Sequence, residues 1–297
     1  MSNIKEIEKC IEENLKTKSS SIDLSRCKLT GNEEVLKELA KVKHLYHIKL
    51  QDNIITNTDF LSNLNFIERL YLANNQISDI SFLTQYSNLK HLDLSNNLVQ
   101  DYTPISKMKR LQGLFLSRNN ILEYSFIEHL TTVQSLSLFE NKIEDISFLK
   151  NLKILTYLNV ECNKIKDISA LKGLKHLQRL NICSNEISSI SLDFLNELPR
   201  LEELFLDKNP VKNIPTELFD KRENVLDSVI EYLEYIEKRN QLIYLINETE
   251  YYTFFDEVRN LNKQNAEVSR LKKRFIHDGG GYEFPEQLKV WVLHNFQ

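Results

Sequence analysis

The sequence is poor in cysteine, glycine and proline, and it contains no long apolar segment. Among its 297 residues are 4 Cys, 6 Gly and 5 Pro, and the cysteines lack the spacing of a disulfide framework. No segment approaches the roughly 20 apolar residues that a membrane-spanning helix needs. The N-terminus has charges every few residues and no apolar run of an export signal. We therefore predict a cytoplasmic protein without membrane contact.

Motifs for catalysis and cofactor binding are also missing. The sequence has no His-Glu-x-x-His, Cys-x-x-Cys or Gly-x-Ser-x-Gly motif, so it predicts no metal site and no cofactor. It has no Gly-x-x-x-x-Gly-Lys-[Ser/Thr] phosphate loop, and residues 279–281, three glycines, are predicted to form a flexible turn. No cysteine follows Cys183, which excludes a thioester mechanism in the C-terminal part. We predict a protein that is not an enzyme, with catalysis as the least favoured alternative.

The chain does contain one pattern, Leu-x-x-Leu-x-Leu-x-x-Asn, which occurs eight times. Its last two apolar residues, such as Leu70 and Leu72, are two positions apart and point to one side of a short strand. Each repeat therefore supplies one strand and half of a core layer that a neighbour completes. The asparagines recur every 22 residues, with a final step of 24, at Asn53, Asn75, Asn97, Asn119, Asn141, Asn163, Asn185 and Asn209.

Asparagine recurs at the end of each strand for a physical reason. Its amide can bond to buried backbone groups that the bend in the chain leaves unpaired. Such a bond contributes about 0.5–1.5 kcal/mol net, whereas an unpaired buried polar group costs roughly 1–3 kcal/mol. We therefore predict that the eight asparagines form a buried structural ladder. Cys162 and Cys183 lie on successive repeats, where reduced thiols are favoured over a disulfide.

The repeated pattern resembles the leucine-rich repeat family in its short 22-residue, internalin-like variety, over residues 45–215. The resemblance implies an α/β solenoid with a parallel concave sheet, short 3₁₀ or irregular segments on the convex side, and protein recognition as the usual activity. Three aspartates stand before short apolar pairs, where side-chain capping is predicted to start single helical turns. These are Asp79, Asp145 and Asp167.

Residues 1–44 are predicted to form an N-terminal helical cap with a degenerate repeat. Apolar residues recur on one helical face within 3–16. Thr30 and Glu33 have capping-box spacing and predict the start of a second helix. Cys27 occupies the asparagine position of the degenerate repeat. A solenoid needs such a cap because its first core layer would otherwise face water.

The C-terminal part is predicted to comprise a capping helix within 216–239 and a small α-helical domain at 240–297. The passage from Asn209 through Phe219 into this helix resembles the end of the repeat region in bacterial Roco-type proteins, but nothing in the sequence resembles their GTPase domain. The last part resembles the effector-associated adaptor domains of prokaryotic signalling and immune proteins; the alternative is an extended helical cap. Short helices are predicted at about 240–247, 250–260, 263–276 and 285–295.

Outward strand residues line the predicted concave face. Adjacent strands lie about 4.8 Å apart, so Phe115, Phe139 and Tyr157 are predicted to form a diagonal aromatic cluster. Aromatic residues with a polar rim are typical of protein contacts, although they are alternatively isolated exposed residues or are covered by the C-terminal helices. The candidate partner-binding residues are Tyr71, Phe115, Phe139, Tyr157, Phe205, Arg69, Arg118, Arg179, Asp93 and Glu161.

The leading hypothesis is a non-catalytic recognition module that binds a protein on its concave face. The alternative is an adaptor or regulatory subunit of a prokaryotic signalling or defence system, acting through homotypic helical contacts of 240–297. A net charge of −4 and concave charges of mixed sign argue against a nucleic-acid partner. The basic run at 270–274 is predicted to be a solvated helix face, with a partner contact as the alternative.

Overall fold

The computed structural model describes residues 4–64, 66–215, 218 and 224–248. Its contacts divide the chain into two units, Met1–Leu226 and Asp227–Gln297. The repeats lie in the first unit. The boundaries predicted for the cap, the repeats and the two C-terminal segments stay predictions.

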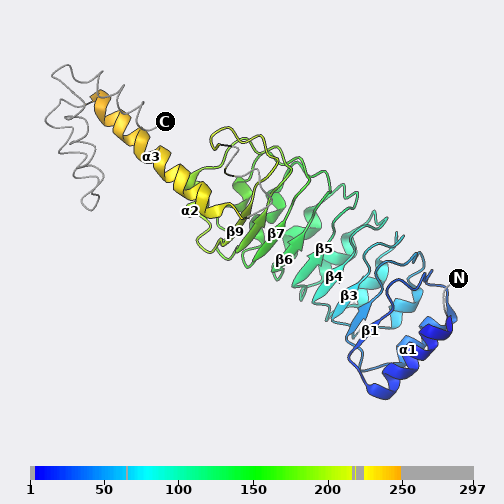
Figure 1. Ribbon diagram of the computed structural model, residues 1–297. Coiled ribbons are helices and arrows are strands. Elements are labelled where there is room, and N and C mark those ends of the chain that lie inside the picture. The colour runs from blue at the N-terminus through cyan, green and yellow to red at the C-terminus, as the bar shows by residue number, and fades with distance from the viewer. Residues whose placement is uncertain (1–3, 65, 216–217, 219–223, 249–297) are drawn as a thin grey trace. The chain divides into compact units, whose positions relative to one another are not determined.

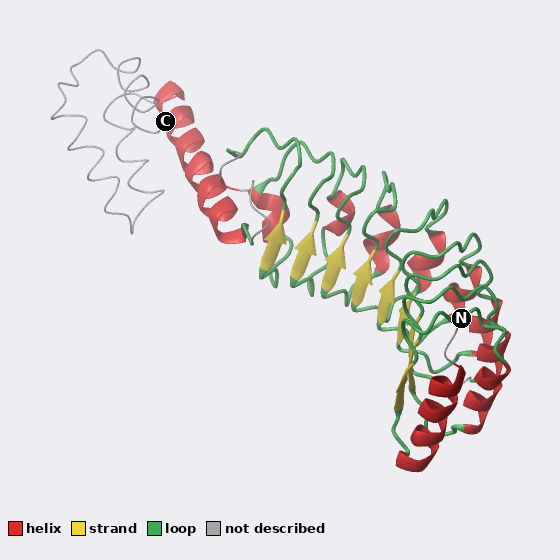
Figure 2. Cartoon of the chain, turned by 45° about the vertical axis from the view of Figure 1, so that its right-hand side comes forward, coloured by secondary structure: helices red, strands yellow, loops and turns green. Residues whose placement is uncertain are grey.

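Nine parallel strands form one sheet in which the strand order follows the sequence order. The strands lie side by side along one face of the repeats, and short helical segments lie on the opposite face (Figures 1 and 2). This arrangement confirms the predicted α/β solenoid, and the degenerate repeat provides its first strand. The strands are β1 (Ser21–Asp23), β2 (His47–Lys49), β3 (Arg69–Tyr71), β4 (His91–Asp93), β5 (Gly113–Phe115), β6 (Ser135–Ser137), β7 (Tyr157–Asn159), β8 (Arg179–Asn181) and β9 (Glu203–Phe205).

The core runs along the inner side of the strands. Each three-residue strand points its middle residue inward, and the middle residues are in register, as for Leu70 opposite Leu92. Both side chains are 0% exposed, as is Leu72, the partner of Leu70 in the repeated pattern. The spacing of two therefore places both apolar residues in the core, as predicted.

The eight asparagines form the predicted ladder. Asn163 makes the largest number of these bonds: its side chain donates to the carbonyls of Leu138 and Val160 at 3.0 and 2.9 Å, and it accepts from the N–H groups of Asn141 and Ile143 at 3.0 and 2.9 Å. Each of the other seven accepts from one backbone N–H. All eight are buried. The residue before each one is left-handed, with φ between 52° and 59°, and this bend turns the asparagine inward. Each ladder side chain thus links its own turn of the solenoid to the preceding one.

The convex side is built from single helical turns. Asp145 accepts a hydrogen bond from the N–H of Ser147 at 2.8 Å. Asp79 and Asp167 accept equivalent bonds from Ser81 and Ser169, which confirms the predicted capping. The 24-residue repeat differs, because its extra length accommodates an α-helical turn, α2 (Leu192–Asn196). The other turns are 3₁₀ helices at Asp59–Asn63, Ser81–Gln85, Thr103–Lys107, Ser125–His129, Ser147–Asn151 and Ser169–Leu171.

The N-terminal cap begins with α1 (Ile4–Thr17), which buries Ile7 and Ile11. The second predicted helix is a 3₁₀ helix, Glu34–Lys41. The Glu33 carboxylate accepts from the N–H of Thr30 at 3.0 Å, as the capping-box spacing predicted.

Residues 224 and 225 extend the hydrogen bonding beyond the last strand. The Asn224 side chain accepts from the N–H of Leu204 at 2.9 Å, and the N–H of Val225 donates to the Leu204 carbonyl at 2.9 Å. The capping helix predicted within 216–239 corresponds to α3 (Leu226–Glu248), which continues through the short helix predicted at about 240–247. The remaining predicted helices, the glycine turn and the basic run lie outside the described residues.

Candidate functional site

The candidate partner-binding aromatics stand on adjacent strands. Phe115 ends β5, Phe139 follows β6 by two residues, and Tyr157 begins β7. All three side chains are half-buried. The ring contacts recorded for the described part of the chain do not join any two of them. They are therefore three separate rings on neighbouring strands, and their role in binding stays a prediction.

Gly113 allows the rings of His91 and Phe115 to lie close to the backbone of the sheet. A Cβ atom at residue 113 would lie 2.6 Å from Nδ1 of His91 and 3.4 Å from Cε2 of Phe115. The missing side chain therefore leaves room for the His91 and Phe115 rings above β5.

The concave arginines Arg118 and Arg179 are each held between a ring and a carboxylate. Arg118 lies 5.3 Å from the centroid of the Phe139 ring and 2.8 Å from the Glu140 carboxylate. Arg179 has the same arrangement, 5.2 Å from the Phe205 ring and 2.7 Å from Glu203. Exposed ion pairs contribute little to stability, but together with the cation–π contacts they fix the direction of both guanidinium groups.

Arg69 differs from these two arginines. It is exposed on β3, and within the described residues no carboxylate lies within ion-pair distance of it. His47 and His91 flank it in register on the adjacent strands. Burial lowers the pKa of both imidazoles, and the positive charge of Arg69 lowers it further. The spacing of 22 between these three residues is visible in the sequence, but the pKa shifts depend on burial in the fold.

The remaining candidates have polar partners. Burial raises the pKa of the Asp93 carboxyl, although the N–H of Ser95 donates to it at 2.9 Å. Glu161 accepts from the side-chain amide of Asn181 at 2.9 Å. Tyr71, which ends β3, is half-buried.

Stability should fall as the pH falls through the histidine range. His47 and His91 have lowered pKa values in the folded chain, so protonation favours the unfolded chain. The loss begins near the unfolded value of about 6.5 and is complete below the folded pKa. In urea unfolding between pH 7.5 and 5.5, the variant His47→Gln/His91→Gln should lose less stability than the native chain. His129→Gln, at an exposed convex histidine, is the control, and a double variant with the native pH dependence would contradict the assignment.

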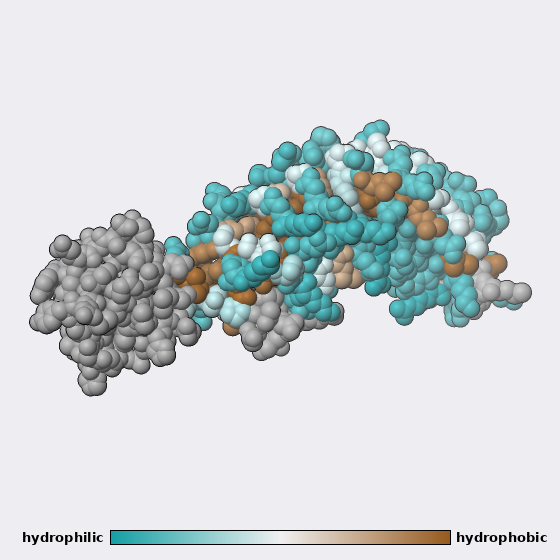
Figure 3. Space-filling model, turned by 90° about the horizontal axis from the view of Figure 1, so that it is seen from above, coloured by the Kyte–Doolittle hydropathy of each residue, from teal (hydrophilic) through white to brown (hydrophobic). Residues whose placement is uncertain are grey.

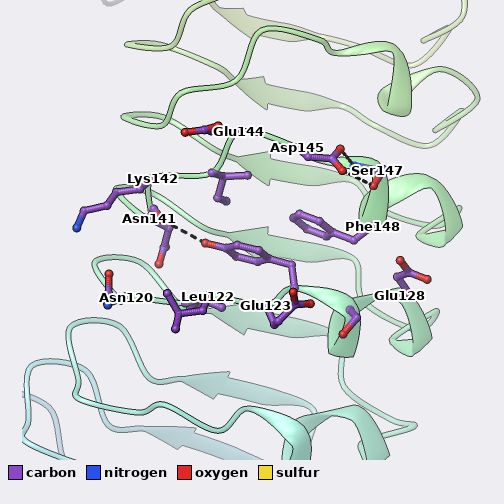
Figure 4. A pocket seen from close by; sticks show the side chains of 14 residues that line it. Asn120, Leu122, Glu123, Glu128, Asn141, Lys142, Glu144, Asp145, Ser147 and Phe148 are labelled. Carbon is purple, nitrogen blue, oxygen red and sulfur yellow. Dashed lines mark hydrogen bonds between the residues drawn. The ribbon is translucent and has the colours of Figure 1, made fainter.

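The sequence analysis missed a pocket on the flank of the solenoid. It has a volume of about 470 Å³ and lies between 120–125 of one repeat and 141–148 of the next (Figure 4). Figure 3 shows that hydrophobic areas on one face of the repeats are separate patches in a mostly hydrophilic surface. One signal for the pocket was present in the sequence: Tyr124 occupies a position where most other repeats have isoleucine.

Among the described residues, no helix has the length and apolar character needed to cross a membrane. No group of three His, Cys, Asp or Glu side chains within the described residues is arranged to hold a metal ion.

Comparison with known proteins identifies the family. Leucine rich repeat profiles match residues 87–130, 131–173 and 155–211. Internalin C2 from Listeria monocytogenes is 31% identical, with a TM-score of 0.57, and the match covers 63% of this chain and 80% of that one. The chain therefore belongs to the leucine-rich repeat proteins. No curated protein sequence matches it.

Two longer solved structures are also similar. The internalin InlF from L. monocytogenes is 29% identical, with a TM-score of 0.57, over 63% of this chain and 54% of that one. The ectodomain of the Arabidopsis thaliana receptor kinase GASSHO1/SCHENGEN3, in complex with CASPARIAN STRIP INTEGRITY FACTOR 2, is 25% identical with a TM-score of 0.52. That match covers 66% of this chain and 25% of the receptor chain. The chain thus spans about half of InlF and a quarter of the receptor ectodomain.

Leucine-rich repeat domains are in general non-catalytic modules that bind proteins.

Proposed function

We propose that the concave face around β5, β6 and β7 binds a protein partner and carries out no reaction. The observation that carries the proposal is the half-exposure of Phe115, Phe139 and Tyr157. The core beneath them is already filled, since the inward residues Leu114 and Leu136 are 0% exposed. Burial in a partner is therefore the remaining source of hydrophobic stabilisation for these rings.

The charged residues around the rings support the same proposal. Arg118 and Arg179 are oriented by their rings and carboxylates before any partner binds. Preordered side chains lose less conformational freedom on binding. Aromatic residues and arginine are also enriched at the centres of protein contacts. The face therefore combines apolar anchors with directed charges, as a partner-binding surface requires.

The decisive variant is Phe115→Ala/Phe139→Ala/Tyr157→Ala. After affinity capture from the native cell and identification of the partner by mass spectrometry, binding of the purified partner should weaken by about 100-fold or more. One central aromatic residue alone contributes about 2 kcal/mol or more in such contacts. The midpoint of urea unfolding should change little, because none of the three rings is buried in the core. Calorimetric titration measures the affinity.

The matched control removes the same number of exposed apolar side chains elsewhere. Ile54, Leu98 and Ile154 are 46%, 61% and 38% exposed, and none is an outward residue of a strand. The variant Ile54→Ala/Leu98→Ala/Ile154→Ala should bind the partner like the native chain. Native affinity in the aromatic variant, or an equal loss in the control, would show that the concave rings are not the binding surface.

We also propose that the protein acts in the cytoplasm. Cys10, Cys27 and Cys162 are partly exposed free thiols, and thiols of this kind persist in a reducing compartment. The adaptor hypothesis concerns residues 240–297, most of which lie outside the described part of the chain, and it stays a prediction.

A further inference from the structure

Two neighbouring repeats interrupt the regular hydrogen bonding beside the asparagine ladder. Elsewhere, apart from Pro210, which has no N–H, the residue after a ladder asparagine donates its N–H to the preceding repeat, as Lys164 does to the Ile143 carbonyl at 2.8 Å. The equivalent bond from Lys142 to the Ile121 carbonyl is not formed. Within the described residues, neither group has another hydrogen-bond partner. The equivalent bond one repeat earlier, from the N–H of Asn120 to the Val99 carbonyl, is not formed either. Two successive repeats therefore lack this backbone bond.

The interruption coincides with a change of side chain. Tyr102 and Tyr124 occupy a position where the neighbouring repeats have Ile80 and Ile146. The Tyr124 ring stacks on Phe148 of the next repeat with centroids 4.9 Å apart. Its hydroxyl donates to the Asn141 carbonyl at 3.2 Å. A tyrosine ring is longer than an isoleucine side chain, and it reaches the next repeat beside the missing backbone bond.

The opened flank is a pocket lined by both polar and apolar side chains. Figure 4 shows Leu122 and Phe148 among its walls. Tyr124 also lines the pocket. Leu122 is 84% exposed, the largest exposed fraction among the large hydrophobic side chains of the described residues. Leu122 therefore offers an exposed apolar surface at the edge of the pocket.

The pocket also has a negative rim. Its lining contains Glu123, Glu128, Glu144 and Asp145 against a single lysine, Lys142, which gives a formal charge of +1 − 4 = −3. Asp145 is engaged in capping and Glu144 lies 3.7 Å from Lys164. Glu123 and Glu128 have no ion pair within the described residues. Two carboxylates at the rim are therefore available to a cation.

We propose that this flank pocket binds a lysine or arginine side chain of the partner protein. A basic side chain joins a long aliphatic stem to a terminal cation, so its stem would pack against Leu122 while its charge meets Glu123 and Glu128. The unpaired carbonyl of Ile121 provides a further acceptor. The inference rests on the proposed function in that the occupant belongs to the bound protein. The pocket would be a second contact with the partner, away from the concave face, and it would be specific for a basic side chain.

The test uses a small probe so that the partner is not needed. N-acetyl-arginine methylamide is titrated into the full chain, and the methyl resonances of Leu122, Ile121 and Ile143 are followed by NMR. Saturable shifts at these methyls are expected, with weak affinity as befits a single side chain. N-acetyl-norleucine methylamide, which has a similar stem without the charge, should shift them much less. Equal shifts with both probes, or none with arginine, would overturn the proposal.

Two variants that replace glutamate with neutral glutamine test whether the carboxylates at the rim bind the probe. Glu123→Gln/Glu128→Gln should weaken arginine binding by about threefold to tenfold, because it removes two exposed ion pairs. Glu186→Gln, at an exposed glutamate two repeats away, should leave it unchanged. Native affinity in the double variant would overturn the proposal even if the probe binds.

The concave variant distinguishes the two proposals. The Phe115→Ala/Phe139→Ala/Tyr157→Ala chain should still bind the arginine probe, because the pocket lies on another side of the repeats. Probe binding together with unchanged partner affinity in this variant would refute the proposed concave site and support the pocket. Loss of partner affinity without any probe binding would support the concave site and refute the pocket.

Discussion

Replacing Asn163 with alanine should lower the free energy of unfolding by about 3–5 kcal/mol. The side chain is 8% exposed, and besides its bonds to the preceding repeat it donates to the Glu161 carbonyl at 3.2 Å. Alanine would leave the N–H groups of Asn141 and Ile143 and the Leu138 carbonyl unpaired, and each orphaned buried group costs roughly 1–3 kcal/mol. The carbonyls of Val160 and Glu161 would keep their bonds from Asn185 and Glu140. Urea unfolding followed by far-UV circular dichroism measures the loss.

Two other asparagines provide matched controls. Asn151 is exposed and its side chain makes no hydrogen bond in the described structure, so Asn151→Ala should change stability by less than about 0.5 kcal/mol. Asn119 lies in the interrupted part of the ladder and accepts only one hydrogen bond, from the N–H of Asn97 at 3.2 Å. Asn119→Ala should therefore cost less than Asn163→Ala. Equal losses at Asn163 and Asn151 would show that the ladder does not hold the repeats together.

Gly31→Ala should destabilise the N-terminal cap by about 3 kcal/mol or more. Gly31 has φ +92°, where a side chain is strained, and a Cβ atom would lie 1.8 Å from the carbonyl oxygen of Asn57. That oxygen cannot move away easily. The N–H groups of Thr56 and Asn57 both donate to the Thr30 carbonyl, and the Asn57 side chain donates to that of Asn32 at 2.9 Å.

A second variant, Gly173→Ala, distinguishes the effect of the steric clash from that of the backbone strain. Gly173 has φ +79°, but the nearest atom to an added Cβ is the flexible Nζ of Lys153 at 3.7 Å. Gly173→Ala should therefore cost only about 1 kcal/mol, the usual penalty for a positive φ. Urea midpoints of the two variants, with hydrogen exchange of the cap amides, give the comparison. A loss at Gly31 no greater than at Gly173 would mean that the cap tolerates the clash.

The repeats were predictable because the residue pattern within each repeat determines its local structure. The spacing of Leu70 and Leu72 determines which side of the strand is buried, and the position of Asn75 determines where the strand ends. The cap was predicted less accurately. The sequence between Glu34 and Lys41 has helical periodicity, but that period alone does not separate a 3₁₀ helix from an α-helix.

The candidate site was only partly predictable for a different reason. The residues that face outward follow from strand alternation, but the directions of long side chains depend on neighbours one repeat away. The positions of Arg118 over Phe139 and of Phe115 beside Gly113 are of this kind. The flank pocket depends on how Tyr124 packs between two repeats. Contacts between repeats therefore limit what a one-repeat pattern can predict.

The asparagine ladder restricts how a chain of this kind changes in length. Because each ladder side chain bonds to the preceding turn, a deletion of one whole 22-residue unit would reconnect equivalent atoms, whereas a deletion of one residue near a strand would misplace an amide. The 24-residue repeat shows where surplus length is accepted: Asn209 still bonds to the N–H of Ile187 at 3.1 Å, and the added residues enter α2 on the convex side. We therefore expect insertions to accumulate on the convex side, while the concave sheet lengthens or shortens by complete strands.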